Sequence, residues 1–186
     1  IVNPLFSLVM GFGVMLGAGG SAVIAKNVGE GEEQQAFDNL STLVFFGAIL
    51  GLVLMVLLLV FMEPILSVLG ATEILMPYCK EYCYYIVGFL APWVLELMFS
   101  SYFITAGKPQ IGLIATLCSG VFNIVGDYVL IVVVGMGIRG AALATGLATC
   151  IPVVIALIYF FNKEHSLHFG RIMNRPRMIL KSCTNG

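Results

Sequence analysis

Residues 111–134 read IGLIATLCSGVFNIVGDYVLIVVV, and this stretch determines the class of fold. An apolar segment of about 20 residues is long enough to cross a bilayer as a helix, and Asp127 is the only charged residue in this one. A carboxylate at that depth costs roughly 2.5–3.5 kcal/mol on insertion scales, so it is usually retained for a function or a paired structural role. Asn123 lies one helical turn before it. The stretch therefore predicts a membrane helix that carries a polar site.

The composition of the whole chain agrees with a membrane location. Of its 186 residues, 60% are hydrophobic and 10% are charged, whereas soluble domains carry about 25% charged residues. We predict an all-α, polytopic transmembrane helical bundle in the cell (plasma or inner) membrane. Its five predicted spans cover residues 1–25, 39–62, 82–106, 111–134 and 140–161. Because the basic residues are few and scattered, no nucleic-acid partner is expected.

The connections between the spans predict how the chain is oriented. Polar residues 26–38 are expected to form a solvated turn, and residues 162–186 a basic linker. Seven basic residues follow spans one, three and five: Lys26, Lys108, Lys163, Arg171, Arg175, Arg177 and Lys181. The connections on the other side of the membrane carry two, Lys80 and Arg139. Since cytoplasmic loops carry the excess of Lys and Arg, the larger set is predicted to be cytoplasmic.

The fourth span has one polar or small face when it is drawn as a helix. Its members fall at positions i, i+3, i+4, i+7 and i+11, namely Thr116, Ser119, Gly120, Asn123 and Asp127. Lipid penalises such a stripe, so it should face the bundle interior or a wet cavity. The short loop to the fifth span predicts that the two helices are antiparallel neighbours.

On the fifth span, Thr145 should then lie at a depth similar to that of Asp127. Oxygens of Asn123, Asp127 and Thr145 would together suit a hard cation, or a hydrogen bond to a protonated acid. The alternative is that Asp127 only pairs with Asn123 or Tyr128 and locks two helices together. We favour the functional interpretation, because charged residues inside a membrane span are rare and usually functional.

A second intramembrane acid, Glu96, lies near Pro92 and Trp93 in the third span. It would attract organic cations if it lines a cavity, with Trp93 supplying a ring face for a cation–π contact; Thr116 and Ser119 would line the same cavity. Equally, Glu96 would serve as a hydrogen-bond partner of a neighbouring helix. Rows of small residues, such as Gly13 with Gly17, Gly47 with Gly51, and Gly140 with Ala144 and Ala148, predict close helix packing.

Enzymatic activity is not expected. No His lies in any predicted span, which excludes a Ser–His dyad there, and the glycines at 17–20 lack the Lys of a phosphate-binding loop. Cys79 and Cys83 lie one helical turn apart without the further ligands that zinc requires. We expect no cofactor, and no metal other than sodium at Asp127.

Four stretches of the chain resemble the multidrug and toxic compound extrusion (MATE) family of transporters. They are GAGGSAVIAKNVGEG at 17–31, EPILSVLGAT at 63–72, TAGKP at 105–109, and NIVGDY at 123–128 followed by GIRGAALAT at 137–145. The resemblance implies a protein of twelve helices in two six-helix lobes, which expels organic cations and other amphipathic, drug-like compounds in exchange for sodium ions or protons. The five spans would be helices two to six of the amino-terminal lobe.

The resemblance also implies roles for particular residues. In relatives whose amino-terminal lobe binds the coupling ion, the site combines an acid on helix one, an Asn and an Asp on helix five, and a Thr on helix six. Asn123, Asp127 and Thr145 match the last three. Residues 1–161 would be part of that lobe, helix one would lie outside the sequence, and the 186 residues alone would not transport. Two alternatives stay open: a flippase for lipids or lipid-linked oligosaccharides, for which the spans lack basic residues, and a structural membrane subunit.

Overall fold

The computed structural model describes residues 3–173 and 176–185, and in this range every regular element is a helix. Arg175, one of the seven basic residues used to predict orientation, lies outside the described residues. The elements in chain order are α1 (Asn3–Gly29), α2 (Glu33–Val60), α3 (Met62–Val68), α4 (Met76–Val87), α5 (Leu90–Thr105), α6 (Pro109–Asp127), the π-helix η1 (Tyr128–Val133), α7 (Ile138–Phe161) and α8 (Pro176–Asn185).

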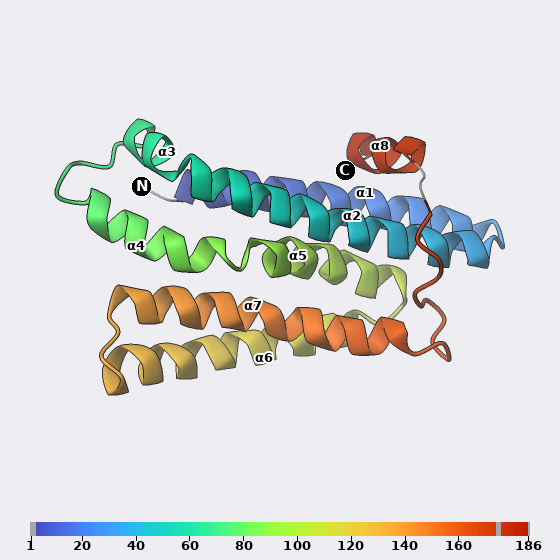
Figure 1. Ribbon diagram of the computed structural model, residues 1–186. Coiled ribbons are helices and arrows are strands. Elements are labelled where there is room, and N and C mark those ends of the chain that lie inside the picture. The colour runs from blue at the N-terminus through green and yellow to red at the C-terminus, as the bar shows by residue number, and fades with distance from the viewer. Residues whose placement is uncertain (1–2, 174–175, 186) are drawn as a thin grey trace.

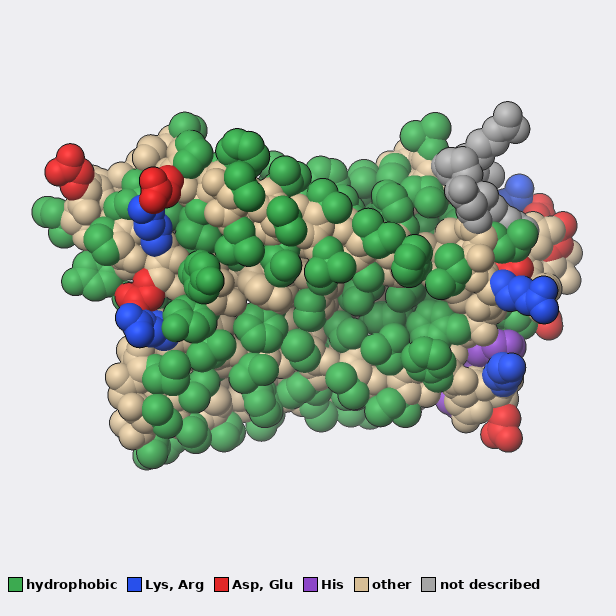
Figure 2. All heavy atoms as spheres, in the orientation of Figure 1, with side chains coloured by type: hydrophobic (Ala, Val, Ile, Leu, Met, Phe, Trp, Pro, Cys, Tyr) green, Lys and Arg blue, Asp and Glu red, His purple; other side chains and the backbone are tan. Residues whose placement is uncertain are grey.

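The long helices lie side by side as a membrane bundle (Figure 1). Among the described residues, four helices are long and apolar enough to cross a bilayer, and α4 with α5 would make a fifth span bent by 57°. The prediction of an all-α, polytopic transmembrane bundle is confirmed. Figure 2 shows one face of the bundle, on which charged side chains gather at the two ends and apolar side chains cover the middle.

The third predicted span is broken rather than continuous. Residues 76–105 form two helices that meet at Gly88 and Phe89, four and three residues before Pro92. A proline ring clashes with the carbonyl group four residues earlier, so a straight helix cannot run through this point. Phe89, at the break between the two helices, packs against α7. Its ring lies directly against Gly146, where any Cβ atom would collide with the ring.

The first predicted turn is shorter than expected, and one of its residues is buried. We expected residues 26–38 to form a solvated turn, but α1 continues to Gly29 and α2 begins at Glu33. Asp38 lies in the second turn of α2, where its side chain is only 7% exposed. Hydropathy marks the apolar part of a helix and not its polar ends, which explains why both helices extend beyond the predicted spans.

The predicted rows of small residues are confirmed as close packing contacts. Cβ atoms added at Gly13 and Gly17 would meet Leu97 and Ser101 of α5, and those at Gly47 and Gly51 would meet Met98 and Ala91 of the same helix. Small residues allow helix backbones to approach closely where lipid offers no hydrophobic gain. Helix α5 is therefore the centre of the bundle, and it packs against α1, α2 and α7.

The segment after α7 is docked along α2. Asp38 Oδ1 accepts a hydrogen bond from the Arg171 amide at 2.8 Å, and Ser41 Oγ donates one to the Gly170 carbonyl at 3.2 Å. The Gly170 amide in turn donates to the Phe37 carbonyl at 3.2 Å. We name residues 162–173 the linker segment. Helix α8 follows and packs against α1, so the predicted polar linker includes a docked irregular segment and a helix.

Candidate functional site

The predicted site residues Asn123 and Thr145 are in contact. Asn123 Nδ2 on α6 donates a hydrogen bond to Thr145 Oγ1 on α7 across 3.2 Å. The helices approach closely here because Gly126 faces Ala144, and a Cβ atom on this glycine would lie 3.2 Å from the Ala144 Cβ. The two helices are antiparallel neighbours, as the short loop predicted.

Asp127 lies one turn further along the same face of α6, and one of its two carboxylate oxygens is not satisfied by the described residues. Its Oδ1 atom is enclosed and has no hydrogen-bond partner among the described residues. Tyr82 of α4 lies close enough to interact with the charge of Asp127. Leaving a buried polar atom unpaired costs about 1–3 kcal/mol, and more for a charged group. Such an atom is a natural position for a bound cation or a proton.

The helix changes its geometry directly after Asp127. Residues Tyr128–Val133 form the π-helix η1, in which the Val134 amide bonds to the Val129 carbonyl at 2.9 Å. π-turns inside α-helices are rare and often occur at functional sites. Reasoning from the sequence missed this element. The signal available was the run of mostly β-branched residues at 129–134, whose side chains crowd an α-helix.

Ser119, predicted to line a substrate cavity, bonds instead to the backbone of α7. Its Oγ atom donates to the Ala148 carbonyl at 2.8 Å. Ala148 lies four residues before Pro152, which has no amide hydrogen, so the Ala148 carbonyl lacks its regular hydrogen bond within the helix. Ser119 therefore supplies the missing hydrogen bond from the neighbouring helix, which explains how α7 continues through an internal proline.

The other predicted cavity residues do not gather around one space. Glu96 and Thr116 line a crevice between α5, α6 and Pro152 whose volume is about 10 Å³, near the smallest that holds one water molecule. Thr116 is exposed and bonds to its own helix at the Gly112 carbonyl. Trp93 packs elsewhere, with its ring centroid 5.3 Å from that of Phe6 on α1.

The expected polar face of α6 is thus only partly turned inward. Ser119 is buried and both Asn123 and Asp127 are partly buried, but Thr116 and Gly120 are exposed. The reason is the position of α6 at the edge of the bundle, where it contacts α7 and, less extensively, α5. Glu96 and Asp127 lie at different heights along the bundle. Glu96 lines the same crevice as Thr116, and Thr116 is about 16 Å from Asp127 along α6, at a rise of 1.5 Å per residue.

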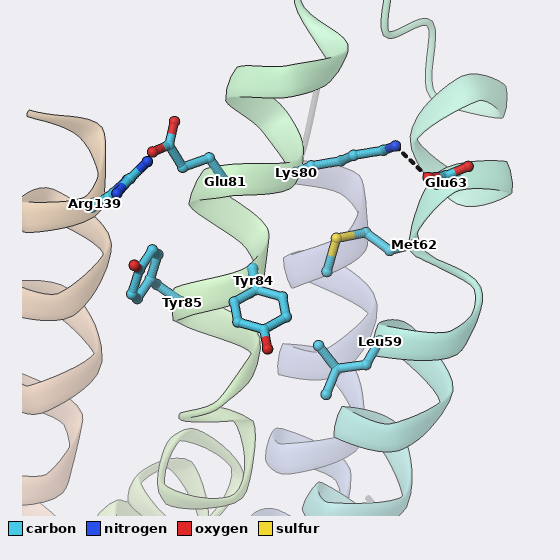
Figure 3. A pocket seen from close by; sticks show the side chains of 8 residues that line it. All are labelled: Leu59, Met62, Glu63, Lys80, Glu81, Tyr84, Tyr85 and Arg139. Atoms are coloured by element: carbon cyan, nitrogen blue, oxygen red, sulfur yellow. Dashed lines mark hydrogen bonds and ion pairs between the residues drawn. The ribbon is translucent and has the colours of Figure 1, made fainter.

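A larger hollow opens at the end of the bundle opposite the linker segment (Figure 3). It has a volume of about 440 Å³, but contains none of the predicted site residues. Lys80 pairs with Glu63 of α3, and Arg139 of α7 pairs with Glu81. Each charge is therefore neutralised by a partner, so these pairs connect α4 to the helices on either side of it and leave no free charge for a ligand.

The sequence of the chain matches that of a known family. The family described as MatE matches residues 1–129. The multidrug export protein MepA of Staphylococcus haemolyticus (strain JCSC1435) is 32% identical over 90% of this chain and 37% of its own length. MepA of Staphylococcus aureus (strain MRSA252) is 28% identical over 96% of this chain and 40% of its own length. The chain therefore belongs to the MatE family, whose members are transporters and not enzymes.

Solved structures show the same fold. A multidrug resistance MATE family transporter in an inward-facing conformation superimposes with a TM-score of 0.92 at 19% identity, over 100% of this chain and 43% of that one. The Vibrio cholerae transporter VcmN in its bent form gives 0.86 at 20% identity, over 96% of this chain and 41% of that one. The chain thus spans about two fifths of the length of the proteins that it matches.

Proposed function

We propose that this chain forms part of a secondary active transporter that exports drug-like organic cations or amphipathic compounds in exchange for sodium ions or protons. Within it, Asp127 is the residue whose occupancy couples the two fluxes. One observation carries the proposal: the enclosed Asp127 Oδ1 atom has no hydrogen-bond partner among the described residues, although it lies in a membrane span. The export function of the MepA relatives supports the choice of substrate class.

The three side chains suit a small hard cation. Asn123 uses its amide nitrogen to reach Thr145, so this bond does not occupy the Asn123 side-chain oxygen, one helical turn from Asp127. Oxygen ligands of this kind are those that hard cations prefer. A sodium ion held by Asn123, Asp127 and Thr145 would supply the missing positive charge. A proton on Asp127 would remove the negative charge instead, and either would end the cost of the unpaired oxygen.

Coupling follows if the two conformations of the transporter bind the ion unequally. A ligand shifts a conformational equilibrium only by its differential affinity for the two states. The short π-helix η1 after Asp127 supports this arrangement, because a local change of helical geometry beside the acid gives the site a segment that differs from regular helix.

The test replaces Asp127 by Asn in the full-length protein. We expect efflux of ethidium from cells expressing Asp127→Asn to fall to the level of cells without the protein. Glu73→Gln, the same change of acid to amide at an exposed loop residue, should leave efflux unchanged. Thermal stability separates function from structure. Since Oδ1 has no partner to lose, the variant should melt no lower than wild type. A lower melting temperature together with normal efflux would mean that Asp127 only locks helices.

A further inference from the structure

Glu96 is the second acid inside the membrane bundle, and ion coupling at Asp127 makes no use of it. It lies about 14 Å from the end of α5 at Thr105, at 1.5 Å per residue. Its side chain is partly buried, and no other described residue forms a hydrogen bond or an ion pair with the carboxyl group. Acids inside membrane spans are rare and usually functional. The question is therefore what neutralises Glu96.

The neighbours of Glu96 on α5 show which way its side chain points. Leu97 packs against Gly13 of α1, and Leu95 approaches Gly47 of α2. Successive side chains on a helix point in directions about 100° apart. Glu96 is thus turned away from α1 and α2, toward the crevice that α5 forms with α6 and α7.

The crevice beside Glu96 is large enough for one water molecule and too small for an organic cation. Its volume is about 10 Å³, whereas sites for small molecules have about 300–1,000 Å³. The side-chain oxygens that line it belong to Glu96, Ser100 and Thr116. These are fewer than the about six oxygen ligands that hard metal cations take. Size and ligand number together favour a proton as the group that neutralises the acid.

The polar groups around the crevice suit a neutral carboxyl group. Thr116 donates its hydroxyl hydrogen to the Gly112 carbonyl at 3.0 Å, so its oxygen can only accept a further hydrogen bond. Cys150 of α7 lies close enough to interact with the charge of Glu96, but its thiol donates to the Gly146 carbonyl at 3.7 Å. A protonated carboxyl group supplies the donor that the Thr116 oxygen can accept.

Within the described part of the chain, no positive charge is placed to balance an ionised Glu96. Three basic residues pair with other acids, namely Lys26, Lys80 and Arg139. The others lie in connections outside the helices, namely Lys108, Lys163 and Arg171. Ser100 offers one neutral hydroxyl, which does not offset the cost of removing a carboxylate from water; an unpaired acid in apolar surroundings becomes neutral instead.

We propose that Glu96 is a second proton-binding site, in which the carboxyl group donates a hydrogen bond to the Thr116 oxygen, directly or through one water molecule. One proton then removes the unbalanced charge and pairs both side chains. The site is about 16 Å from Asp127 along α6, and it does not depend on ion coupling at Asp127. It gives the bundle a second acid whose charge changes with pH.

The test is infrared spectroscopy of the purified full-length protein in liposomes, because the carbonyl band of a protonated carboxyl group is separate from carboxylate bands. At neutral pH, Glu96→Gln should lose the carboxylic acid band of Glu96. Glu73→Gln, the same change at an exposed loop residue, should leave it. The band should also disappear as the pH is raised. Each comparison is repeated in an Asp127→Asn background, so that failure of coupling at Asp127 leaves the result intact.

A second variant keeps the acid and removes its partner. Thr116→Val should move the Glu96 band to higher frequency, because loss of the hydrogen bond stiffens the carboxyl C=O bond. Thr72→Val, at an exposed position between α3 and α4, should leave the band in place. Thermal stability, measured in parallel, shows that each variant is folded.

Three results would overturn the proposal. The first is a wild-type band in Glu96→Gln, and the second is an unshifted band in Thr116→Val. The third is loss of the Glu96 band on addition of sodium or ethidium, since a cation and not a proton would then neutralise the acid.

Discussion

Asn123 on α6 and Thr145 on α7 are joined by a hydrogen bond of 3.2 Å, one helical turn from the unpaired carboxylate oxygen of Asp127. The bond fixes the level at which α6 and α7 meet. It also places two further oxygen-bearing side chains beside the acid. The ion site that we propose therefore depends on the contact between two neighbouring helices and not on one residue alone.

Replacing Thr145 by Val should weaken the site without unfolding the protein. The substitution keeps the shape of the side chain but removes the oxygen that accepts the Asn123 hydrogen bond. We expect the affinity for the coupling ion to fall about fivefold, which corresponds to one hydrogen bond of about 1 kcal/mol. The measurement is the ion concentration that gives half-maximal efflux by full-length protein in liposomes.

Thr149→Val is the matched control for this variant. Thr149 lies one turn further along α7, and its hydroxyl donates a hydrogen bond to the Gly146 carbonyl of its own helix, at 2.7 Å. It should leave the half-maximal ion concentration unchanged. An equal effect of the two substitutions would show that Thr145 acts only through the stability of α7.

Ser119→Ala should destabilise the protein by about 1–3 kcal/mol, because the Ala148 carbonyl loses the hydrogen bond that replaces the one Pro152 cannot donate. The same substitution in a Pro152→Ala background should cost little, since residue 152 then has an amide hydrogen for that carbonyl. A double-mutant cycle in the free energy of unfolding measures this coupling. Thr116→Ala, which removes a hydroxyl bonded to its own helix at 3.0 Å, should change stability by no more than about 0.5 kcal/mol. Additive effects of Ser119→Ala and Pro152→Ala would contradict our interpretation.

Asp38→Ala should release the linker segment from α2. The carboxylate accepts hydrogen bonds from the Arg171 amide at 2.8 Å and from Gln34 Nε2 at 3.1 Å. Without it, trypsin should cleave faster after Lys163 and Arg171, because proteolysis of a docked segment requires local opening. Glu33→Ala, an exposed acid in the first turn of the same helix, serves as the control. Equal cleavage rates in the two variants would mean that Asp38 does not hold the linker.

Local patterns in the sequence were enough to predict most of the bundle. Long apolar runs predicted the spans, and the spacing of small residues predicted that Gly47 and Gly51 pack closely against another helix, which is α5. The pairing of Asn123 with Thr145 also followed from local information. Helical spacing placed the polar face on α6, and the short loop placed α7 beside it.

Features that depend on distant parts of the chain were not predictable in this way. Asp38 is buried because the linker segment, more than 120 residues later, supplies its hydrogen-bond donor. Ser119 belonged to a polar face in the sequence, but its partner is the carbonyl that Pro152 leaves free on another helix. Thr116 and Gly120 share that face and remain exposed, because no described helix covers them. Periodicity predicts which residues share a face, and tertiary contacts decide what covers it.

The central claim is that Asp127 couples the ion to the exported substrate. The most direct test places purified full-length protein in liposomes, imposes a sodium or a proton gradient, and follows the movement of a fluorescent organic cation. Wild type should move the cation only when one of the two gradients is present, and Asp127→Asn should move none under either gradient. Transport by Asp127→Asn at the wild-type rate, with the same dependence on the gradient, would contradict the claim.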